Sequence, residues 1–377
     1  MKVFDLFCGT GGLTKGFENS TKENFDIRFG IDVLDSSVNT FKLNHSNAIG
    51  LSEDIRKVRR SEVERLTGIK RGELDVLVGG PPCQGFSSIR PFRSKNDDDP
   101  RNSLFEEYAS FVNYFRPKVF VLENVVGLAT HKKGNTLELM QECFHEIGYD
   151  TDWRLLNAAH FGVPQKRERF VMIGVERGAK ILFPIPTHTY KGSTIGYKDK
   201  SRILEPNSNE HLLDAISTME AIGDLPSIAS GESATSYMQE PKNDYQAARR
   251  KSTEELTLHV ATTHSEKMME IIRHSGKNIS CIPKHLITSG FSSCYSRLDA
   301  DDPAVTLTVN FVHPSSNRCI HPTLDRALTP REGARLQSYD DDFRFFGTRT
   351  QITKQIGNAV PPLLGLAIAD TISDMNI

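Results

Sequence analysis

Short apolar runs alternate with segments of helical periodicity over the first half of the chain. The apolar runs predict strands at Val3–Phe7, Ile27–Ile31, Asp75–Gly79, Lys118–Leu122 and Phe170–Val175. Strands that alternate with helices are typical of a parallel sheet whose two faces are both covered by helices. The chain is therefore predicted to begin with an open α/β domain.

The same pattern predicts helices at two places in this domain and two near the end of the chain. Apolar residues recur at helical spacing over 104–115, before a proline, and over 137–147, before a glycine. Helical patterns return over 331–337 and 363–372. Because the last of these is strongly apolar, we expect it to pack back on the first domain.

The segment between these regions lacks a sustained period and is rich in Ser, Thr, Asn and Gly. Its part from 242 to 286 is mildly basic, which fits either a solvated surface or contact with nucleic acid. We expect three parts: an α/β domain over 1–186, a smaller irregular domain over 187–325, and a closing segment over 326–377. The basic residues in question are Lys242, Arg249, Arg250, Lys251, Lys267, Arg273, Lys277 and Lys284.

Composition narrows the class of protein without identifying it. The chain has 377 residues, 38% of them apolar, and a formal net charge of −2, which argues against bulk attraction to polyanions but permits a local basic cleft. Its six cysteines include no C-x-x-C pair, so reduced thiols are expected. No window approaches 18 consecutive apolar residues and no signal peptide is recognisable, so we expect a cytoplasmic protein without a membrane span.

A glycine-rich turn follows the first predicted strand, at Cys8-Gly9-Thr10-Gly11-Gly12. A dinucleotide fingerprint needs a third glycine where this chain has Thr14, which disfavours a pyrophosphate ligand and a nicotinamide oxidoreductase. Asp32 ends the second strand, where a carboxylate can accept from ribose hydroxyls, and Asp54 could accept from an adenine amine. Together they indicate a nucleoside cofactor such as S-adenosylmethionine. The alternative is a tight turn with two surface acids.

Three further strand ends carry reactive side chains. Cys83 follows Pro81-Pro82 at the end of a strand, where the prolines would fix the direction of its thiol. Glu123 follows an apolar strand, where a carboxylate is costly unless it serves a partner. Arg167 and Arg169 would lie on the same side of the chain if that segment is extended. The alternatives are a buried thiol, a salt-bridged acid and ordinary surface arginines.

With these residues in place, the chain resembles the DNA (cytosine-C5) methyltransferases of bacterial restriction-modification systems over nearly its whole length. Six blocks follow one another in the family's order. They are Phe7-x-Gly9-x-Gly11-Gly12, Pro81-Pro82-Cys83-Gln84, Glu123-Asn124-Val125, Gln165-x-Arg167-x-Arg169, Arg331-Glu332-x-Ala334-Arg335-Leu336-Gln337 and Gln355-Ile356-Gly357-Asn358-Ala359-Val360-Pro361-Pro362. The resemblance implies a Rossmann-like methyltransferase domain with a smaller target-recognition domain over 187–325.

The resemblance also implies a mechanism. Cys83 would attack C6 of a flipped-out cytosine, so that C5 accepts the methyl group. Glu123 would contact N3 and the exocyclic amine, while Arg169 would bind O2 with help from Arg167. The segment after the nucleophile would close over double-stranded DNA, with Ser87, Arg90, Arg93 and Lys95 as DNA contacts.

The family's cofactor is S-adenosylmethionine, and its product is S-adenosylhomocysteine. The resemblance assigns Phe7 and Asp54 to adenine and Asp32 to ribose. It places the glycine turn at the methionine side. The cofactor residues it implies are Phe7, Cys8, Gly11, Gly12, Leu13, Asp32, Val33, Asp54, Ile55, Pro82, Asn358 and Val360. Asp32 replaces the family's usual Glu, and Val33 replaces a frequent aromatic residue.

Partners follow from the same resemblance. We expect a monomer that acts on double-stranded DNA, with a separate cognate restriction endonuclease, and no metal site. The histidines of the irregular segment, His259, His264, His274 and His285, are interpreted as polar surface or DNA-facing groups. Two alternatives stay open: an RNA cytosine-C5 methyltransferase, and a DNA-binding protein on a catalytically decayed scaffold.

Overall fold

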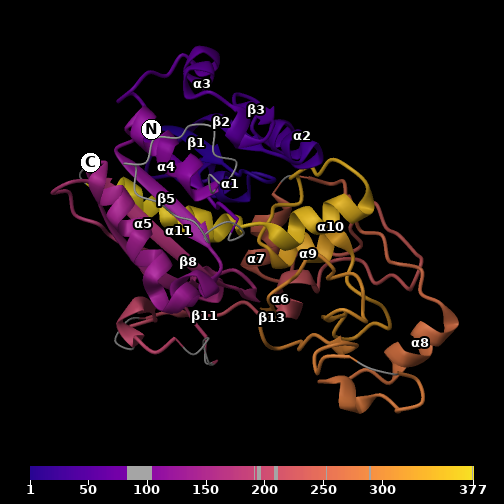
Figure 1. Cartoon of the computed structure of the whole chain (residues 1–377). Helices are drawn as coiled ribbons and strands as arrows, with labels where there is room; N and C mark the ends of the chain where they lie inside the picture. The colour runs from indigo at the N-terminus through magenta and orange to yellow at the C-terminus, as the bar shows by residue number, and fades with distance from the viewer. Residues whose placement is uncertain are drawn as a thin grey trace.

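The computed structural model describes residues 1–82, 104–190, 192, 197–207, 211–251, 253–287, 290–375 and 377. In Figure 1 these form two lobes. The left lobe holds the large sheet and both chain ends, and the right lobe holds most of the second half of the chain. The last helix, α11 (Pro362–Ser373), lies in the left lobe beside elements from the start of the chain.

The sheet of the left lobe has eight strands among the described residues, in the order β10-β6-β8-β5-β4-β1-β2-β3. Four of the five predicted strand positions lie in its parallel part, which confirms the α/β class. The strands are β1 (Lys2–Leu6), β2 (Asp26–Asp32), β3 (Ile49–Ser52), β4 (Val76–Gly79), β5 (Val119–Asn124), β6 (Tyr149–Asn157), β8 (Glu168–Glu176) and β10 (Ile203–Leu204).

The parallel arrangement predicted for the sheet does not extend to β8. This strand lies between β5 and β6 and runs antiparallel to both, with Asn124 opposite Phe170 and Asn157 opposite Glu168. The chain can place it there because β6 and β8 are joined by a short connection, as antiparallel neighbours allow. As a result the start of β8 lies at the same edge of the sheet as the end of β5.

Helices cover both faces of this sheet, as the pattern predicted. Because successive strand residues point to opposite faces, Leu77 contributes to one core while Val76 and Val78 contribute to the other. The first core packs against α3 (Arg60–Thr67), α4 (Leu104–Phe115) and α5 (Asn135–Glu146). The second packs against α1 (Gly12–Glu18), α2 (Asp35–Asn44) and α11. The helices predicted over 104–115 and 137–147 are confirmed as α4 and α5.

Two glycines let the end of the chain pack on its beginning. A Cβ on Gly16 of α1 would lie 2.3 Å from the backbone N of Leu366, and a Cβ on Gly365 of α11 would lie 2.4 Å from the carbonyl of Leu13. The two helices therefore touch backbone to backbone. The expected return of the closing helix to the first domain is confirmed. The helix that precedes it in the chain, α10 (Arg349–Asn358), packs on α9 (Pro330–Leu336) in the other lobe.

The right lobe has short elements around a separate apolar core. Among the described residues, the two-stranded pairs of β7 (Gln165–Lys166) with β13 (Ala304–Val305) and of β12 (Ser296–Arg297) with β14 (Arg318–Ile320) border it. A further pair, β9 (His188–Thr189) with β11 (Leu213–Asp214), lies against the left lobe, where β9 contacts residues 158–161. Its remaining helices are α6 (Thr218–Ile222), α7 (Asp244–Arg250) and α8 (Glu266–Arg273). β10, at 203–204, pairs with β6 of the large sheet although it follows residue 186 in the chain. The expected domain boundaries remain proposals.

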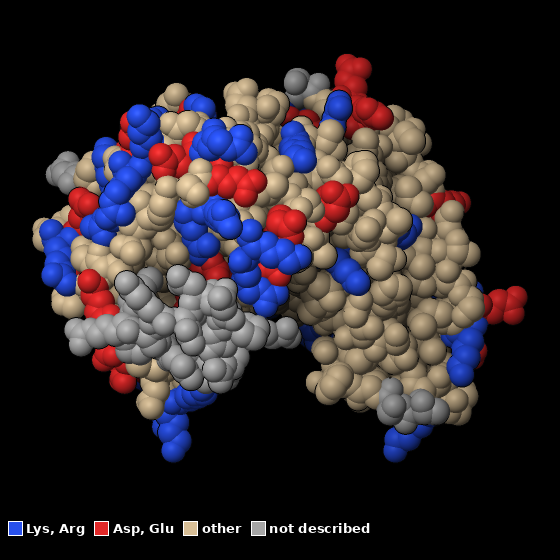
Figure 2. Space-filling view, turned by 45° about the horizontal axis from the view of Figure 1, so that its top comes forward, with Lys and Arg blue, Asp and Glu red and all other residues tan. Residues whose placement is uncertain are grey.

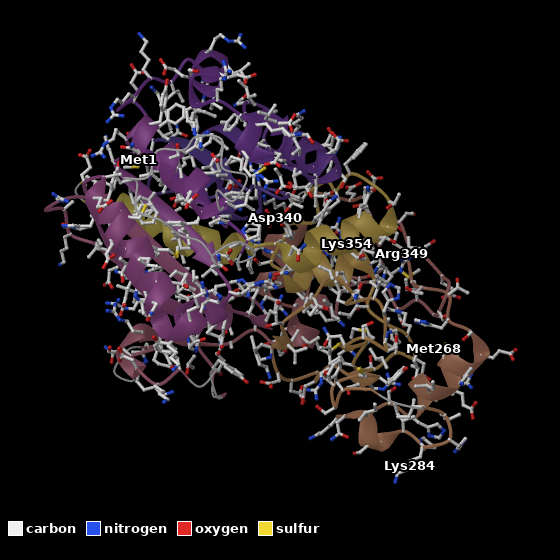
Figure 3. All side chains as sticks on the ribbon, viewed as in Figure 1. Met1, Met268, Lys284, Asp340, Arg349 and Lys354 are labelled. Atoms are coloured by element: carbon white, nitrogen blue, oxygen red, sulfur yellow. The ribbon has the colours of Figure 1, made fainter. Side chains whose placement is uncertain are left out.

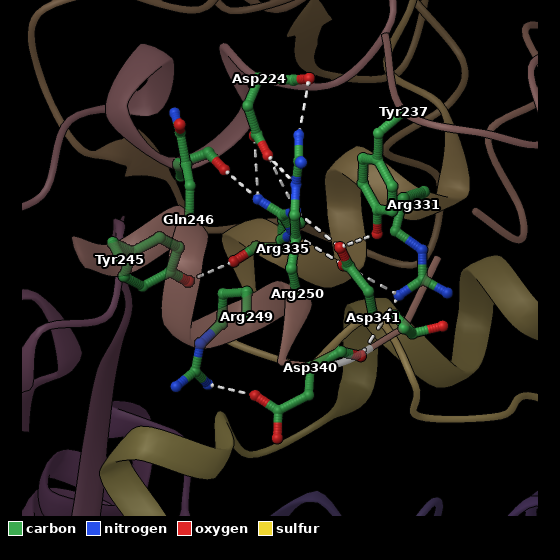
Figure 4. Close-up of polar contacts among 12 residues, drawn as sticks. Asp224, Tyr237, Tyr245, Gln246, Arg249, Arg250, Arg331, Arg335, Asp340 and Asp341 are labelled. Carbon is green, nitrogen blue, oxygen red and sulfur yellow. Dashed lines mark hydrogen bonds and ion pairs between the residues drawn. The ribbon is translucent and has the colours of Figure 1, made fainter. Parts of the chain in front are cut away.

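A network of buried arginines and carboxylates holds the right lobe together (Figure 4). Arg335 of α9 is fully buried and pairs with Asp224 at 3.1 Å and with Asp341 at 2.6 Å. Arg250 of α7 shares Asp224 at 2.8 Å, and Arg331 shares Asp341 at 3.4 Å. Although burial would raise the pKa of Asp341, its hydrogen bonds and charge pairing with arginine hold that pKa below the ordinary value.

The sequence-based interpretation of the mild basic stretch is thus corrected in part. Arg249 and Arg250 are buried and pair with Asp340 and Asp224, and Lys251 also pairs with Asp340, so these cations neutralise acids of the same protein. Lys284, by contrast, lies exposed at the far end of the right lobe (Figure 3). Lys267, Arg273 and Lys277 are exposed as well.

The interpretation of His259 as a surface or DNA-facing group is wrong. Its ring is fully buried, with Nε2 2.8 Å from the carbonyl of Pro226 and Nδ1 3.1 Å from the hydroxyl of Thr329. Burial lowers the pKa of His259, as expected for an imidazole that packs neutral inside a lobe. His274 and His285 are exposed, and His264 is half-buried.

Residues Arg349–Ser373 are long and apolar enough, by length and composition, to cross a membrane. They form two helices, α10 and α11, that separate at Ala359–Pro361, and 61% of the most apolar window is buried inside the protein. The apolar character of this stretch therefore serves the packing of two cores.

Breaking the buried charge network should cost more stability than removing a surface charge. For Arg335→Leu we expect the free energy of unfolding to fall by about 3–5 kcal/mol, because Asp224 and Asp341 each lose a buried partner. Urea denaturation followed by circular dichroism measures this. Arg344→Leu, at an exposed arginine of the same segment, is the matched control. Equal loss in both variants would contradict the assignment of stability to the network.

Candidate active site

The reactive side chains lie where the strands of the large sheet end. Parallel strands β1, β2, β4 and β5 bring their carboxyl ends to one edge, and the antiparallel β8 brings its first residues to the same edge. Open α/β sheets bind ligands at this edge, since the connecting segments leave a crevice there. This geometry explains why side chains from five distant segments meet.

Glu123 and Arg169 form an ion pair at this edge. The guanidinium Nε of Arg169 lies 2.7 Å from Oε1 of Glu123, and each residue is 9% exposed. Both side chains are held on rigid strands, because Glu123 pairs in register with Val171 of β8. The two predicted catalytic groups are therefore adjacent, with a carboxylate and a guanidinium presented side by side.

The backbone before the predicted nucleophile is tied to the same strand. Asn124 donates from Nδ2 to the carbonyl of Pro81 at 2.8 Å, and a Cβ on Gly80 would lie 2.9 Å from Oε2 of Glu123. The chain thus leaves β4 beside the carboxylate, and a side chain at position 80 would crowd Oε2 of Glu123. Pro81 is buried and Pro82 is exposed.

Several predicted site residues fall outside the part of the chain that the structure describes. They are the predicted nucleophile Cys83 and the predicted DNA contacts Ser87, Arg90, Arg93 and Lys95. Their assignments remain predictions. What the described residues establish is the position of the backbone up to Pro82, two residues beyond the glycine that touches Glu123.

The side chain of Arg167 is bonded to buried backbone. Its backbone N–H donates to the carbonyl of Gln165 at 2.8 Å, so the chain turns here, and β7 ends before β8 begins. The guanidinium is 1% exposed and donates to the carbonyls of Leu307 and Gly357, each at 3.1 Å. Burial lowers the pKa of Arg167, as does the charge of Arg169. Arg167 therefore joins three distant segments of backbone.

The glycine-rich turn adopts a left-handed backbone. Phe7, Gly9 and Gly11 have φ values of 61°, 52° and 79°, which a residue with a side chain adopts only at a cost. Gly12 is needed for space, because a Cβ there would lie 2.5 Å from both the hydroxyl of Tyr339 and the carbonyl of Val360. At Gly9, by contrast, a Cβ would meet nothing within 4 Å.

Asp32 braces this turn from the next strand. Its Oδ2 accepts from the backbone N–H of Gly9 at 3.0 Å, and its Oδ1 accepts from that of Leu34 at 2.9 Å. Burial raises the pKa of Asp32 despite these bonds. Each carboxylate oxygen keeps a further lone pair for a ligand. Val33 beside it is 67% exposed and offers an apolar surface at the sheet edge.

The other predicted cofactor residues differ in what they present. Asp54 follows β3, but its carboxylate is paired with Arg56 at 2.5 Å, and the hydrogen bond from Arg56 lowers the pKa of Asp54. Leu13 and Ile55 bury their side chains in the two cores, so only their backbone can face a ligand. Asn358 is exposed at the end of α10.

Cys8 is buried and cannot serve as the nucleophile. Its thiol is 7% exposed, and burial together with the charges of Asp5 and Asp32 raises its pKa well above the ordinary value. A thiol held protonated in this way is a poor nucleophile.

Sequence reasoning missed two residues beneath the glycine turn. The hydroxyl of Tyr339 lies 2.6 Å from that of Thr10, and the ring of His45 lies 3.3 Å from the carbonyl of Gly11. Tyr339 lies two residues after the 331–337 block, so its proximity to that block was the available signal. His45 follows an amphipathic helix and carries no motif of its own.

A cleft of about 700 Å³ opens between the lobes beside Arg169. The left lobe lines it with residues around Arg169 and the end of β5, and the right lobe lines it with Ser293, Val305, Thr306, Asn317 and Arg318. Figure 2 shows a hollow between the two lobes, and Lys and Arg side chains gather on the left lobe near it. A ligand in the cleft would contact both lobes at once.

Comparison with known proteins places these features in a family. Residues 1–374 match the family described as C-5 cytosine-specific DNA methylase. The type II methyltransferase M1.HphI of Haemophilus parahaemolyticus is 34% identical over 100% of this chain and 87% of its own length. M.AgeI of Thalassovita gelatinovora, also a type II methyltransferase, is 32% identical over 99% of both chains.

A crystal structure shares the fold. It is that of a prophage-encoded E. coli protein described as a DNA modification methyltransferase, with a TM-score of 0.73, 23% identity, and coverage of 100% of this chain and 99% of that chain. At this identity the likeness concerns the architecture, which agrees with the Rossmann-like fold expected from the sequence.

The contact of Gly12 with the closing segment makes it sensitive to a single methyl group. For Gly12→Ala we expect a loss of about 1–3 kcal/mol in the free energy of unfolding, since the Val360 carbonyl cannot rotate away from the added Cβ. Urea denaturation measures the change. Gly127→Ala, where a Cβ would meet nothing within 4 Å, is the control and should leave stability nearly unchanged. A Gly12→Ala protein with the wild-type free energy of unfolding would show that the closing segment does not pack tightly against the turn.

Proposed function

Because the chain belongs to the C-5 cytosine-specific DNA methylases, we propose that it transfers a methyl group from S-adenosylmethionine to C5 of a cytosine flipped out of double-stranded DNA. The observation that carries this proposal is the Glu123–Arg169 pair, 2.7 Å apart, beside the backbone that leads to Cys83. A carboxylate and a guanidinium placed side by side match the amine and N3 edge of cytosine and its O2.

In the proposed reaction the thiolate of Cys83 adds to C6 of the ring. The C5–C6 electron pair then becomes available at C5, and charge builds up toward O2 and N3. Glu123 delivers or shares a proton at N3, while Arg169 donates hydrogen bonds to O2, so the two side chains stabilise the charge where it develops. After methylation a base removes the C5 proton, and the returning electrons expel the Cys83 thiolate.

The residues at the glycine turn fit the cofactor. Asp32 has lone pairs for ribose hydroxyls, Val33 presents an apolar surface for a base, and the space over Gly9 is open. When bound, S-adenosylmethionine supplies an electrophilic methyl group. Asp54 is paired with Arg56, so it would accept a hydrogen bond from adenine in addition to those from Arg56. The further contacts proposed are Phe7, Cys8, Gly11, Gly12, Leu13, Ile55, Pro82, Asn358 and Val360.

We assign Arg167 a different role from the one first expected. Its two terminal nitrogens donate to the backbone carbonyls of Leu307 and Gly357, so it supports Arg169 by fixing the turn that precedes β8. It acts as a positioning residue. Arg169 alone of the pair would contact the base.

The cleft between the lobes is the proposed DNA site. Right-lobe residues at its rim, Asn317 and Arg318 among them, can contact phosphates or base edges while the base enters toward Glu123. We retain 187–325 as the proposed target-recognition region and Ser87, Arg90, Arg93 and Lys95 as proposed DNA contacts.

The biological setting is proposed from the relatives. M1.HphI and M.AgeI are type II methyltransferases and match this chain almost from end to end. We therefore propose a role in a restriction-modification system, with a separate endonuclease that cuts the same site. The protein would act as a monomer in the bacterial cytoplasm.

Removing the thiol tests the mechanism. We expect Cys83→Ser to lose methyl transfer by at least about 1000-fold while DNA binding stays measurable, because the hydroxyl is a far weaker nucleophile. Transfer of labelled methyl groups to duplex DNA and gel-shift titration measure the two properties. DNA containing 5-fluorocytosine should trap a covalent adduct with wild-type protein only, since fluorine cannot leave as a proton does.

Two outcomes would count against the proposal. Full turnover by Cys83→Ser would refute the nucleophile, and absence of an adduct under methylating conditions would refute the covalent route. Labelling of transfer RNA in preference to duplex DNA would favour the RNA methyltransferase alternative. DNA binding with no turnover by the wild-type protein would favour a decayed scaffold.

The two arginines should separate by phenotype. For Arg167→Met we expect a loss of about 2–4 kcal/mol in stability, because two buried carbonyls lose their donor. For Arg169→Gln we expect turnover to fall by about 100-fold or more with a smaller change in stability. Steady-state methylation kinetics and urea denaturation measure both variants. The reverse pattern would return the base-binding role to Arg167.

A further inference from the structure

Thr10 carries the one side chain at the tip of the glycine turn. Its neighbours Gly9, Gly11 and Gly12 have none, so a side chain can hold this part of the turn only from position 10. Thr10 is 3% exposed, and its hydroxyl lies 2.6 Å from that of Tyr339, which is fully buried. The tip of the turn is therefore tied by its own side chain to the closing segment of the chain.

The glycines make this tie important. Gly9 and Gly11, on either side of Thr10, both have positive φ values. Glycine also adopts many other backbone conformations at little cost, so the left-handed shape of the turn is one of several that its sequence allows. A hydrogen bond at Thr10 favours the observed shape over the others.

Tyr339 is itself fixed at the end of α9, in the other lobe. Ser338 has a φ of 64°, and the N–H of Tyr339 donates to the carbonyl of Ala334 at 2.9 Å, a pattern that ends a helix and turns the chain back. The carbonyl of Ser338 accepts from Arg249 of α7 at 2.7 Å, and its hydroxyl accepts from the N–H of Leu363 at 3.1 Å. The phenol is thus presented to Thr10 from a rigid support.

We propose that Tyr339 is a positioning residue for the cofactor, whose hydroxyl holds Thr10 and thereby keeps the glycine turn in the shape that receives S-adenosylmethionine. This inference rests on the proposed function, since it takes that turn to be the cofactor site. A site that spends part of its time in other conformations binds more weakly in proportion to that time. The end of α9 therefore sets the affinity of a site that lies at the edge of the sheet in the left lobe.

Other hydrogen bonds hold the residues on either side of Thr10. Asp32 accepts from the N–H of Gly9 at 3.0 Å, and the carbonyl of Gly11 accepts from the Thr14 hydroxyl at 3.1 Å and the Lys15 N–H at 2.8 Å. Loss of the Tyr339 hydroxyl should therefore loosen the tip of the turn without unfolding the turn. The expected result is weaker binding, not its abolition.

The experiment is calorimetric titration of the full-length protein with S-adenosylhomocysteine. Tyr339→Phe and Thr10→Val each remove one hydroxyl with little change in shape, and we expect each to raise the dissociation constant about three- to tenfold. The double variant should bind no more weakly than either single variant, because all three lose the same bond. Thr10→Ser keeps a hydroxyl and should bind within about twofold of wild type.

Hydrogen exchange of the ligand-free protein, followed by mass spectrometry, gives a second readout. The peptide over residues 8–15 should exchange about three- to tenfold faster in Tyr339→Phe and in Thr10→Val than in wild type. Tyr149→Phe is the matched control. Its hydroxyl is also buried and donates to the carbonyl of Pro117 at 2.6 Å, but it lies at the other end of the strands. It should leave both the affinity and the exchange of residues 8–15 unchanged.

Several results would overturn the inference. They are wild-type affinity in Tyr339→Phe or Thr10→Val, effects that multiply in the double variant, and a loss in Thr10→Ser or Tyr149→Phe as large as that in Tyr339→Phe. If the wild-type protein does not bind S-adenosylhomocysteine, the proposed cofactor fails, and this role of Tyr339 fails with it.

Discussion

The ion pair between Glu123 and Arg169 depends on the direction of one strand. Were β8 parallel to its neighbours, its first residues would lie at the opposite edge of the sheet, away from the end of β5. The antiparallel placement brings a carboxylate and a guanidinium from separate segments to within 2.7 Å on rigid backbone. Each charge is nearly buried, and such a charge is tolerated when its partner is fixed beside it. The proposed chemistry needs both groups preorganised, and the sheet provides this.

The closing segment of the chain completes what the sheet begins. Residues 338–360 reach under the glycine turn through Tyr339 and Val360, while α11 anchors the segment against α1 by contact between glycines. The helix before it, α9, is held in the other lobe by the pairs of Arg335 with Asp224 and Asp341. The buried charges therefore do more than stabilise one lobe, since they fix the starting point of the segment that supports the turn.

Local sequence patterns predicted what depends on local forces. The apolar runs gave five strands of the large sheet, but β3, β6 and β10 were missed. β6 carries Asp150, Asp152 and Arg154 at alternate positions because it lies near the sheet edge, and β3 is only four residues long. The direction of β8 has no local signal, because the apolar pattern of a strand does not show whether it pairs parallel or antiparallel with its neighbours.

The candidate site shows the same division. The motifs placed Glu123 and Arg169 together correctly, since each directly follows or begins a strand. They also placed Arg167 beside Arg169, which would hold only for an unbroken extended segment, and the turn at Gln165–Arg167 removes that condition. Contacts such as Thr10 with Tyr339 join residues 329 positions apart and leave no periodic trace in the sequence. The buried arginines likewise looked like surface cations, because charge composition does not reveal which acids lie opposite.

The hydrogen bonds that connect the two lobes affect how a base could reach Glu123. Gln165 bonds to Leu336 and Leu307, and Arg167 bonds to Leu307 and Gly357, all within buried backbone. Sliding one lobe over the other would break these bonds together and leave several polar groups unpaired in the interior, at about 1–3 kcal/mol each. Movement of the substrate is cheaper, because extruding one nucleotide from a duplex costs about a few kcal/mol. On the proposed function, these bonds between the lobes therefore favour a reaction in which the DNA rearranges while the Glu123–Arg169 pair stays in place.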